Sequence, residues 1–138
     1  MRACIGVKGL TFDAAHYTRH STRKCLNLHG HTYTVNVEVY GDIDPETGMV
    51  MNFLDLKRVV KDVIEEYDHK LIVPRRDLDK ITIRGPFNLA VKTIDYPEAT
   101  TEYIALDIAR RIYERIKKPV KVQLFEGAGS YAEVYWEG

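Results

Sequence analysis

The chain has 138 residues, and its 45% hydrophobic content is enough for one domain to bury a proper core. Its 20 lysine and arginine residues balance its 20 aspartate and glutamate residues, so no net positive field attracts nucleic acid or an anionic membrane. No apolar stretch approaches the roughly 20 residues that span a bilayer, and the N-terminus lacks the apolar core of a signal peptide. We therefore expect one cytoplasmic domain over residues 1–138, with neither nucleic acid nor a membrane as partner.

Alternating hydrophobic residues predict two long strands in the first third of the chain. Residues 3–16 alternate loosely, and Gly6 and Gly9 suggest that this strand bends or bulges. Residues 31–40 alternate cleanly, so that His31 and the valines that follow it lie on one face. We expect these two segments to pair in antiparallel orientation.

Helical spacing of apolar residues predicts two amphipathic helices. The first covers residues 53–67, and Asn52 is available as its N-cap. The second runs from about residue 101 to 117 and ends before Pro119. Each helix has an apolar face that it can bury against a sheet.

The segment between the helices, residues 73–97, is interrupted by prolines. We expect it to form a long loop that carries a short hairpin, in which ITIR and NLAVKTI flank Gly85 and Pro86. This loop lies close in sequence to the end of the first helix, where it can shape a pocket.

The chain ends in two further strand patterns, over residues 120–125 and 131–136, on either side of a glycine-rich turn. The order of elements predicts an α+β fold, in which two helices cover one face of a four-stranded antiparallel sheet. The exposed edges of such a sheet favour closure by oligomerisation.

Three histidines can meet on the inner face of the first two strands. His29 and His31 are two residues apart, and His16 continues the even spacing of inward residues on the partner strand. An isolated His-x-His pair is more often a hydrogen-bonded pair of core residues, but a third histidine changes that judgement. Three imidazoles with one open position form the usual catalytic zinc shell, so we predict a zinc site.

Cys25 is one of only two cysteines, too few for a disulfide framework. It could be a fourth ligand in a structural site, or a thiol held apart from the metal as base or nucleophile, and spacing leaves both open. Asp68 and His69 follow the first helix, where a paired imidazole would suit a nearby ionised thiol. The alternative is a histidine that interacts with the helix dipole.

Glu126 continues the buried face of its strand, where an unpaired carboxylate is costly, so it either marks the exposed end of the strand or binds something. A planar ligand with adjacent N–H donors would satisfy both of its oxygens. Thr100, Thr101 and Glu102 open the second helix, and N-capping with an acidic first turn is sufficient to explain them.

Six motifs follow one another in an order that resembles a known enzyme family. They are TFDAAH, C-x-x-x-H-G-H-x-Y, GMVMNFLDLK, YDHK, TTE and FEG. Together they resemble the 6-pyruvoyl-tetrahydropterin synthase family, including its queuosine-pathway branch, 6-carboxy-tetrahydropterin synthase. The resemblance covers most of the chain, and the element C-x-x-x-H-G-H with a preceding A-A-H and a later D-H is specific.

The resemblance implies a role for each of the residues discussed above. It implies that zinc is bound by His16, His29 and His31. It implies that Cys25 is the thiol that abstracts a proton, and that Asp68 and His69 relay protons for it. It implies that Glu126 anchors a pterin ring with help from Thr100, Thr101 and Glu102. The implied architecture is the tunnelling fold, usually a homohexamer with active sites between subunits.

The implied substrate is 7,8-dihydroneopterin triphosphate, converted to 6-carboxy-tetrahydropterin with loss of triphosphate and acetaldehyde. Triphosphate elimination alone, which yields the 6-pyruvoyl product, is the alternative, as are a non-catalytic pterin- or zinc-binding paralogue and a zinc hydrolase. Two features depart from the family pattern. Asn52 stands where the family commonly has aspartate, and residues 73–97 are longer than the usual connection.

Overall fold

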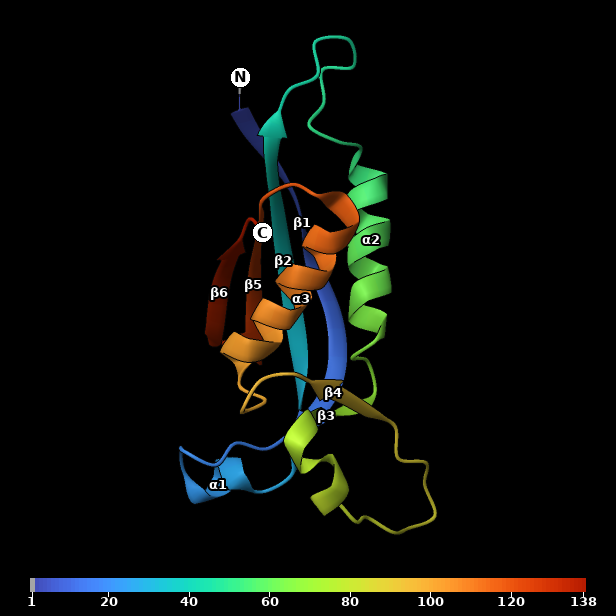
Figure 1. Ribbon diagram of the computed structural model, residues 1–138, viewed down its shortest axis with the longest axis vertical. Helices are drawn as coiled ribbons and strands as arrows, with labels where there is room; N and C mark the ends of the chain where they lie inside the picture. The colour runs from blue at the N-terminus through green and yellow to red at the C-terminus, as the bar shows by residue number, and fades with distance from the viewer. Residues whose placement is uncertain (1) are drawn as a thin grey trace.

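The computed structural model describes residues 2–138 and contains one mixed six-stranded sheet with two long helices on one face (Figure 1). The strands lie across the sheet in the order β4-β3-β1-β2-β5-β6. Their bounds in chain order are Arg2–His16 for β1, His29–Asp42 for β2, Lys70–Pro74 for β3, Val91–Ile94 for β4, Val120–Glu126 for β5 and Ser130–Trp136 for β6.

β1 and β2 form the long antiparallel pair that the alternating residues predict, with His16 opposite His29. The register shifts between Val7 and Leu10, around Gly9, whose φ of 78° is the left-handed conformation that suits glycine. Val7 packs against the core before this bulge and Leu10 after it, so the inward-facing residues change from odd to even numbers. The bulge therefore brings His16 to the inner face.

The prediction of a purely antiparallel four-stranded sheet was wrong. β1, β2, β5 and β6 pair antiparallel as expected, but β3 pairs in parallel with β1, and β4 in parallel with β3. The predicted hairpin around Gly85 and Pro86 was also wrong, because residues 81–84 form no strand. β3 and β4 have only 5 and 4 residues, and β3 is buried along most of its length, so neither displays the alternation of a half-exposed strand.

Both predicted helices are confirmed, as α2 (Phe53–Glu65) and α3 (Thr101–Ile116). Asn52 caps α2 by accepting a 2.8 Å hydrogen bond from the backbone N–H of Leu54. Two short helices, α1 (Arg23–Leu26) and the 3-10 helix η1 (Arg75–Lys80), lie at the lower end of the sheet in Figure 1. No helix within residues 2–138 has the length and apolar character needed to cross a membrane.

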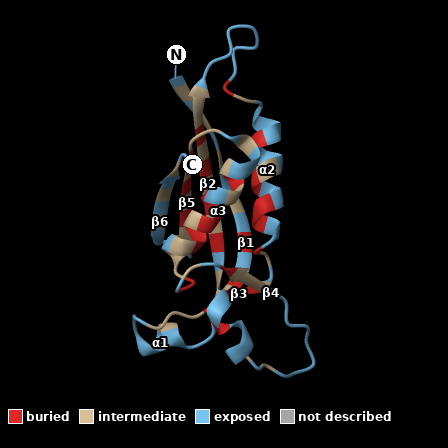
Figure 2. Ribbon diagram, in the orientation of Figure 1, coloured by how far each residue is buried: buried red, intermediate tan, exposed pale blue. Residues whose placement is uncertain are grey.

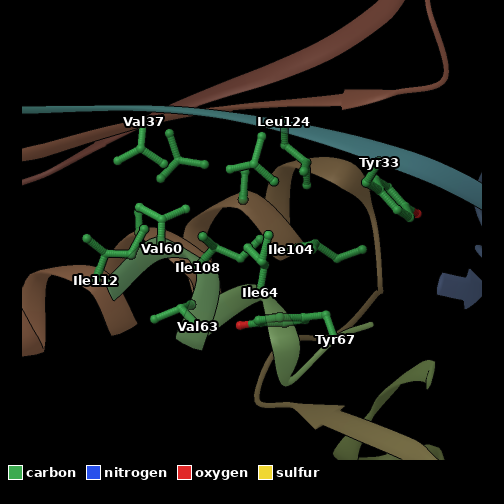
Figure 3. Close-up of a cluster of buried hydrophobic side chains, with 14 of the residues drawn as sticks. Tyr33, Val37, Val60, Val63, Ile64, Tyr67, Ile104, Ile108, Ile112 and Leu124 are labelled. Carbon is green, nitrogen blue, oxygen red and sulfur yellow. The ribbon is translucent and has the colours of Figure 1, made fainter. Parts of the chain in front are cut away.

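The core lies between the helices and the sheet, where buried residues of α2, α3, β2 and β5 face one another (Figure 2). Valine and leucine side chains of β2 and β5 meet isoleucines of α3 in this layer (Figure 3). The buried Tyr67 hydroxyl donates to Asp107, which also accepts from Arg111 at 3.0 Å, so these polar groups at the edge of the core are paired. Burial of this layer fixes both helices against the strands that carry the histidines.

Replacing Asn52 by alanine should lower the free energy of unfolding by about 1 kcal/mol, because the N–H of Leu54 loses its partner. The control Asn52→Asp keeps an acceptor at the N-cap and should stay close to the wild-type value. Urea unfolding at one fixed protein concentration measures both variants. An alanine variant as stable as the wild type would remove the capping role.

Candidate metal and pterin site

The structure brings the three predicted metal ligands together at one end of β1 and β2. His16 and His29 are direct cross-strand partners, and His31 lies two residues further along β2 on the same face. The ring centroids are 4.7, 4.8 and 5.0 Å apart, and one ligand nitrogen of each ring lies within 4.8 Å of the others. Cys25 is not part of this group of ligand atoms. The grouping favours a thiol separate from a three-histidine site.

Backbone carbonyls set the tautomers of two of these imidazoles. The Nδ1 of His16 lies 2.7 Å from the carbonyl oxygen of Ala99, and the Nδ1 of His29 lies 2.6 Å from that of Asn27. A carbonyl only accepts, so each Nδ1 carries the proton and each Nε2 keeps a lone pair. Burial lowers the pKa of His16, which favours the neutral ring that binds a metal.

The free nitrogens have no hydrogen-bond partner among the described residues. The Nε2 atom of His16 is buried and unbonded, a costly state for a polar atom, and the buried Nε2 of His31 has only the Glu126 carboxylate, 3.2 Å away, beside it. A metal ion bound between the rings would use these lone pairs, and three neutral imidazoles are a donor set that Zn²⁺ accepts. The residues present therefore fit the ion that the spacing predicts.

Glu126 lies at the end of β5, beside the histidines. Its Oε1 is 3.2 Å from the Nε2 of His31 and its Oε2 is 3.9 Å from that of His16. The Thr101 hydroxyl donates a 2.5 Å hydrogen bond to the same carboxylate. Glu126 also lines a pocket of about 270 Å³ together with Thr101 and Glu102. The residue thus contacts the imidazoles and borders a pocket.

The opening of α3 divides its threonines between two tasks. Thr100 is the N-cap and accepts from the backbone N–H of Tyr103 at 3.2 Å, as N-capping predicts. Thr101 contacts Glu126 instead, and Glu102 is an acidic residue of the first helical turn. Thr101 is therefore the member of this segment that contacts the carboxylate directly.

Cys25 sits in α1, in the loop between β1 and β2. The Thr22 hydroxyl donates to its Sγ at 3.3 Å, and Thr22 also caps this short helix. Hydrogen bonds to the sulfur, that from Thr22 first, lower the pKa of the Cys25 thiol to about 7. A substantial fraction of the thiol is therefore ionised at neutral pH, as a proton-abstracting group requires.

Asp68 and His69 are held against β1 after the end of α2. One oxygen of Asp68 accepts from the backbone N–H of Asp13 at 2.9 Å, and the other lies 2.9 Å from the His69 Nδ1. The backbone N–H of His69 donates to the carbonyl of Asp13 at 2.6 Å, and its φ of 58° is unusual for a residue with a side chain. The neighbouring carboxylate raises the pKa of His69, so Asp68 is the main influence on this imidazole.

The thiol and this Asp-His pair do not meet within one chain. The contacts of Cys25 lie within its own loop, whereas His69 lines a pocket of about 580 Å³ with Asp13 and Phe87. In Figure 1, α1 lies below the sheet at the lower left, whereas the end of α2 lies higher and to the right. Within one chain His69 thus shares its pocket with His31 of the histidine cluster, whereas no contact joins it to Cys25 among the described residues.

Sequence reasoning missed the groups that support the histidines. The carbonyls of Ala99 and Asn27 have no side-chain signature, so no pattern could have revealed them. Three charged residues of one ion-pair network, namely Arg19, Asp77 and Glu98, also went unnoticed. Their charges resembled those of solvated loops, and the burial of Asp77 and Glu98, with 2% and 8% of their surface exposed, distinguishes them.

The fold and the site define a class of α+β protein that carries three imidazoles and a carboxylate at the end of a mixed sheet. The family model described as "6-pyruvoyl tetrahydropterin synthase" matches residues 5–137, and the chain belongs to this family. The same family was inferred from the motifs in the sequence.

Similar proteins carry more than one name within this family. The 6-carboxy-5,6,7,8-tetrahydropterin synthase of Aquifex aeolicus is 42% identical, over 91% of this chain and 86% of its own. The dihydroneopterin monophosphate aldolase of Pyrococcus furiosus is 38% identical, over 91% of this chain and 92% of its own. The fold is similar to the crystal structure of Plasmodium vivax 6-pyruvoyl tetrahydropterin synthase, with a TM-score of 0.80, 24% identity, and coverage of 99% and 98% of the two chains.

The alkylation rate of Cys25 should rise with pH through a midpoint near 7, because only the thiolate reacts and its pKa is about 7. Removing the main hydrogen bond in Thr22→Val should move this midpoint upward. Iodoacetamide labelling, with peptide mapping to separate Cys25 from Cys4, gives the rate at each pH. Equal midpoints in wild type and variant would contradict the assigned cause.

Proposed function

We propose that the protein is a zinc-dependent lyase that converts 7,8-dihydroneopterin triphosphate and water to 6-carboxy-5,6,7,8-tetrahydropterin, triphosphate and acetaldehyde. The observation that carries this proposal is the group of three imidazoles whose ligand atoms lie within 4.8 Å of one another, next to Glu126. The relatives named 6-carboxy-tetrahydropterin synthase support the choice of product. This product would serve the queuosine pathway.

His16, His29 and His31 would hold the Zn²⁺ ion. When bound, the ion would polarise the side-chain hydroxyls of the substrate and make the neighbouring C–H bond more acidic. The carbonyl of Ala99 keeps the His16 ring turned toward that position. The buried and unbonded Nε2 atom of His16 is the reason for preferring a bound metal over a purely structural cluster of histidines.

Glu126 would bind the pterin ring in the pocket that it lines with Thr101 and Glu102. A carboxylate accepts two parallel N–H bonds, the pattern that a pterin edge presents. The hydroxyl of Thr101 holds one oxygen of this carboxylate and so restricts its rotation. Thr100 would contribute through the backbone, because its side chain caps α3.

Cys25 would remove the proton from the substrate side chain, and the imidazole of His69, oriented by Asp68, would exchange protons with it. Since one chain keeps Cys25 and His69 apart, these groups would share an active site only across a subunit boundary. We therefore propose a homo-oligomer, a hexamer by family resemblance, with active sites between subunits. The pocket that His69 lines is open to such a neighbour.

Two related reactions remain as alternatives. Elimination of triphosphate alone would yield a 6-pyruvoyl product from the same substrate. Side-chain cleavage of a dihydroneopterin monophosphate is the reaction that the name of the Pyrococcus furiosus relative suggests. All three reactions need a base and a polarised side-chain hydroxyl, so their products must distinguish them.

Mass spectrometry of the products is the direct test of the proposed function. Zinc-loaded protein incubated with 7,8-dihydroneopterin triphosphate should yield a carboxy-tetrahydropterin, triphosphate and acetaldehyde. A pyruvoyl product would instead assign the enzyme to triphosphate elimination. Turnover of the monophosphate with none of the triphosphate would assign it to the aldolase reaction and overturn the proposal.

Cys25→Ala should lower kcat by about 10²-fold or more, because the proposed base is lost, while zinc content stays at the wild-type level. Cys4→Ala is the matched control, since Cys4 is exposed on β1 and contacts Glu38. Unchanged turnover in Cys25→Ala would end the thiol mechanism. Zinc-dependent phosphate ester hydrolysis in that variant would point to a hydrolase instead.

A further inference from the structure

A network of charged side chains lies close in sequence to both partners of the His16 hydrogen bond. It joins the loop after β1, the helix η1 and the segment before α3, through Tyr17, Arg19, Asp77 and Glu98. Asp77 is 2% exposed and Glu98 is 8% exposed, so both carboxylates are removed from solvent. Buried carboxylates are rare unless they are paired, and these two share Arg19 as a partner.

Arg19 is the centre of this network. Its backbone N–H and its Nη1 each donate a 2.8 Å hydrogen bond to Glu98, one to each carboxylate oxygen. Its Nη2 donates to Asp77, which also accepts from the Tyr17 hydroxyl at 2.6 Å. The planar guanidinium can make both contacts at once because its donors form a fixed fork.

The network connects the two chain segments that form the hydrogen bond of His16 with Ala99. His16 ends β1 three residues before Arg19, and Ala99 directly follows Glu98. The pairing of Arg19 with Glu98 therefore ties together the two chain segments that supply the His16 ring and the Ala99 carbonyl. These two partners lie 83 residues apart in sequence, so the short bond between them depends on tertiary contacts.

We propose that Arg19 is a positioning residue for the metal site. By holding Glu98, it keeps the carbonyl of Ala99 at the Nδ1 of His16 and so keeps the Nε2 of His16 turned toward the other two imidazoles. The inference rests on the zinc site of the proposed function and extends it to a residue that contacts neither metal nor substrate. Loss of such an outer contact typically weakens metal binding by about 10- to 100-fold.

The chain provides a matched control for this inference. Arg75 also pairs with a carboxylate in the same region, since its Nε lies 2.5 Å from Asp95, but both side chains are mostly exposed. Arg19→Met should raise the dissociation constant for Zn²⁺ about 10-fold or more, and Arg75→Met less than about twofold. Arg19→Lys keeps the charge without the fork and should fall between them. Competition with a chromophoric chelator measures each constant.

A second measurement follows His16 without any metal. Hydrogen exchange at the imidazole C2 position, read by mass spectrometry in zinc-free protein, reports how accessible each histidine ring is. His16 should exchange faster in Arg19→Met than in the wild type or Arg75→Met, with the exposed His20 as the internal reference. This measurement does not depend on activity or on zinc.

The two measurements separate failure of this inference from failure of the proposed function. Wild-type zinc affinity in a folded Arg19→Met protein overturns the inference, whatever the exchange rate. If the wild type itself binds no zinc, the proposed function fails. The exchange measurement then decides the positioning role by itself. Faster exchange of His16 in Arg19→Met supports that role, and an unchanged rate overturns it. Should Arg19→Met not fold, Glu98→Gln replaces it, because the amide keeps an acceptor but loses the charge, and the same readings apply.

Discussion

The antiparallel pairing of β1 with β2 is the constraint on which the site depends. It places His16 opposite His29, and the glycine bulge at Gly9 sets which face of β1 those last residues occupy. Without the bulge, the alternation that brings Val7 inward would turn His16 outward, because a one-residue slip moves every side chain to the other face. The core beneath α2 and α3 then holds this register rigid, so the imidazoles are brought together by the sheet itself.

The histidine cluster is supported as much by backbone as by side chains. Carbonyls of Ala99 and Asn27 hold two rings in the tautomer that leaves Nε2 free. Arg19 pairs with two buried carboxylates, and one of them belongs to Glu98, the residue before Ala99. A site of this kind is organised before any ligand arrives, which lowers the cost of ordering it upon binding. The exposed Asp68–His69 pair, by contrast, depends on its own ion pair and on the backbone of Asp13.

Much of the fold could be predicted from local periodicity in the sequence, and the errors in that prediction have one physical cause. Long strands and helices repeat their pattern over many residues, so β1, β2, α2 and α3 were predicted with bounds close to those observed. β3 and β4 are too short to repeat a pattern, and burial of β3 removes the alternation of polar residues. The prolines of residues 73–97 correctly indicated that regular structure is interrupted there. The inference that this segment forms a loop without strands in the main sheet was wrong, because β4 lies within it.

Side-chain spacing along single segments predicts the two helices, the four antiparallel strands and the grouping of the three histidines. The parallel pairing of β3 and β4, the separation of Cys25 from His69 and the contact of Ala99 with His16 depend on the folded chain. Those features are contacts between residues far apart in the chain, and several use backbone atoms that are common to all residues. The local sequence pattern does not predict such contacts, because they form only when the sheet and its core are assembled.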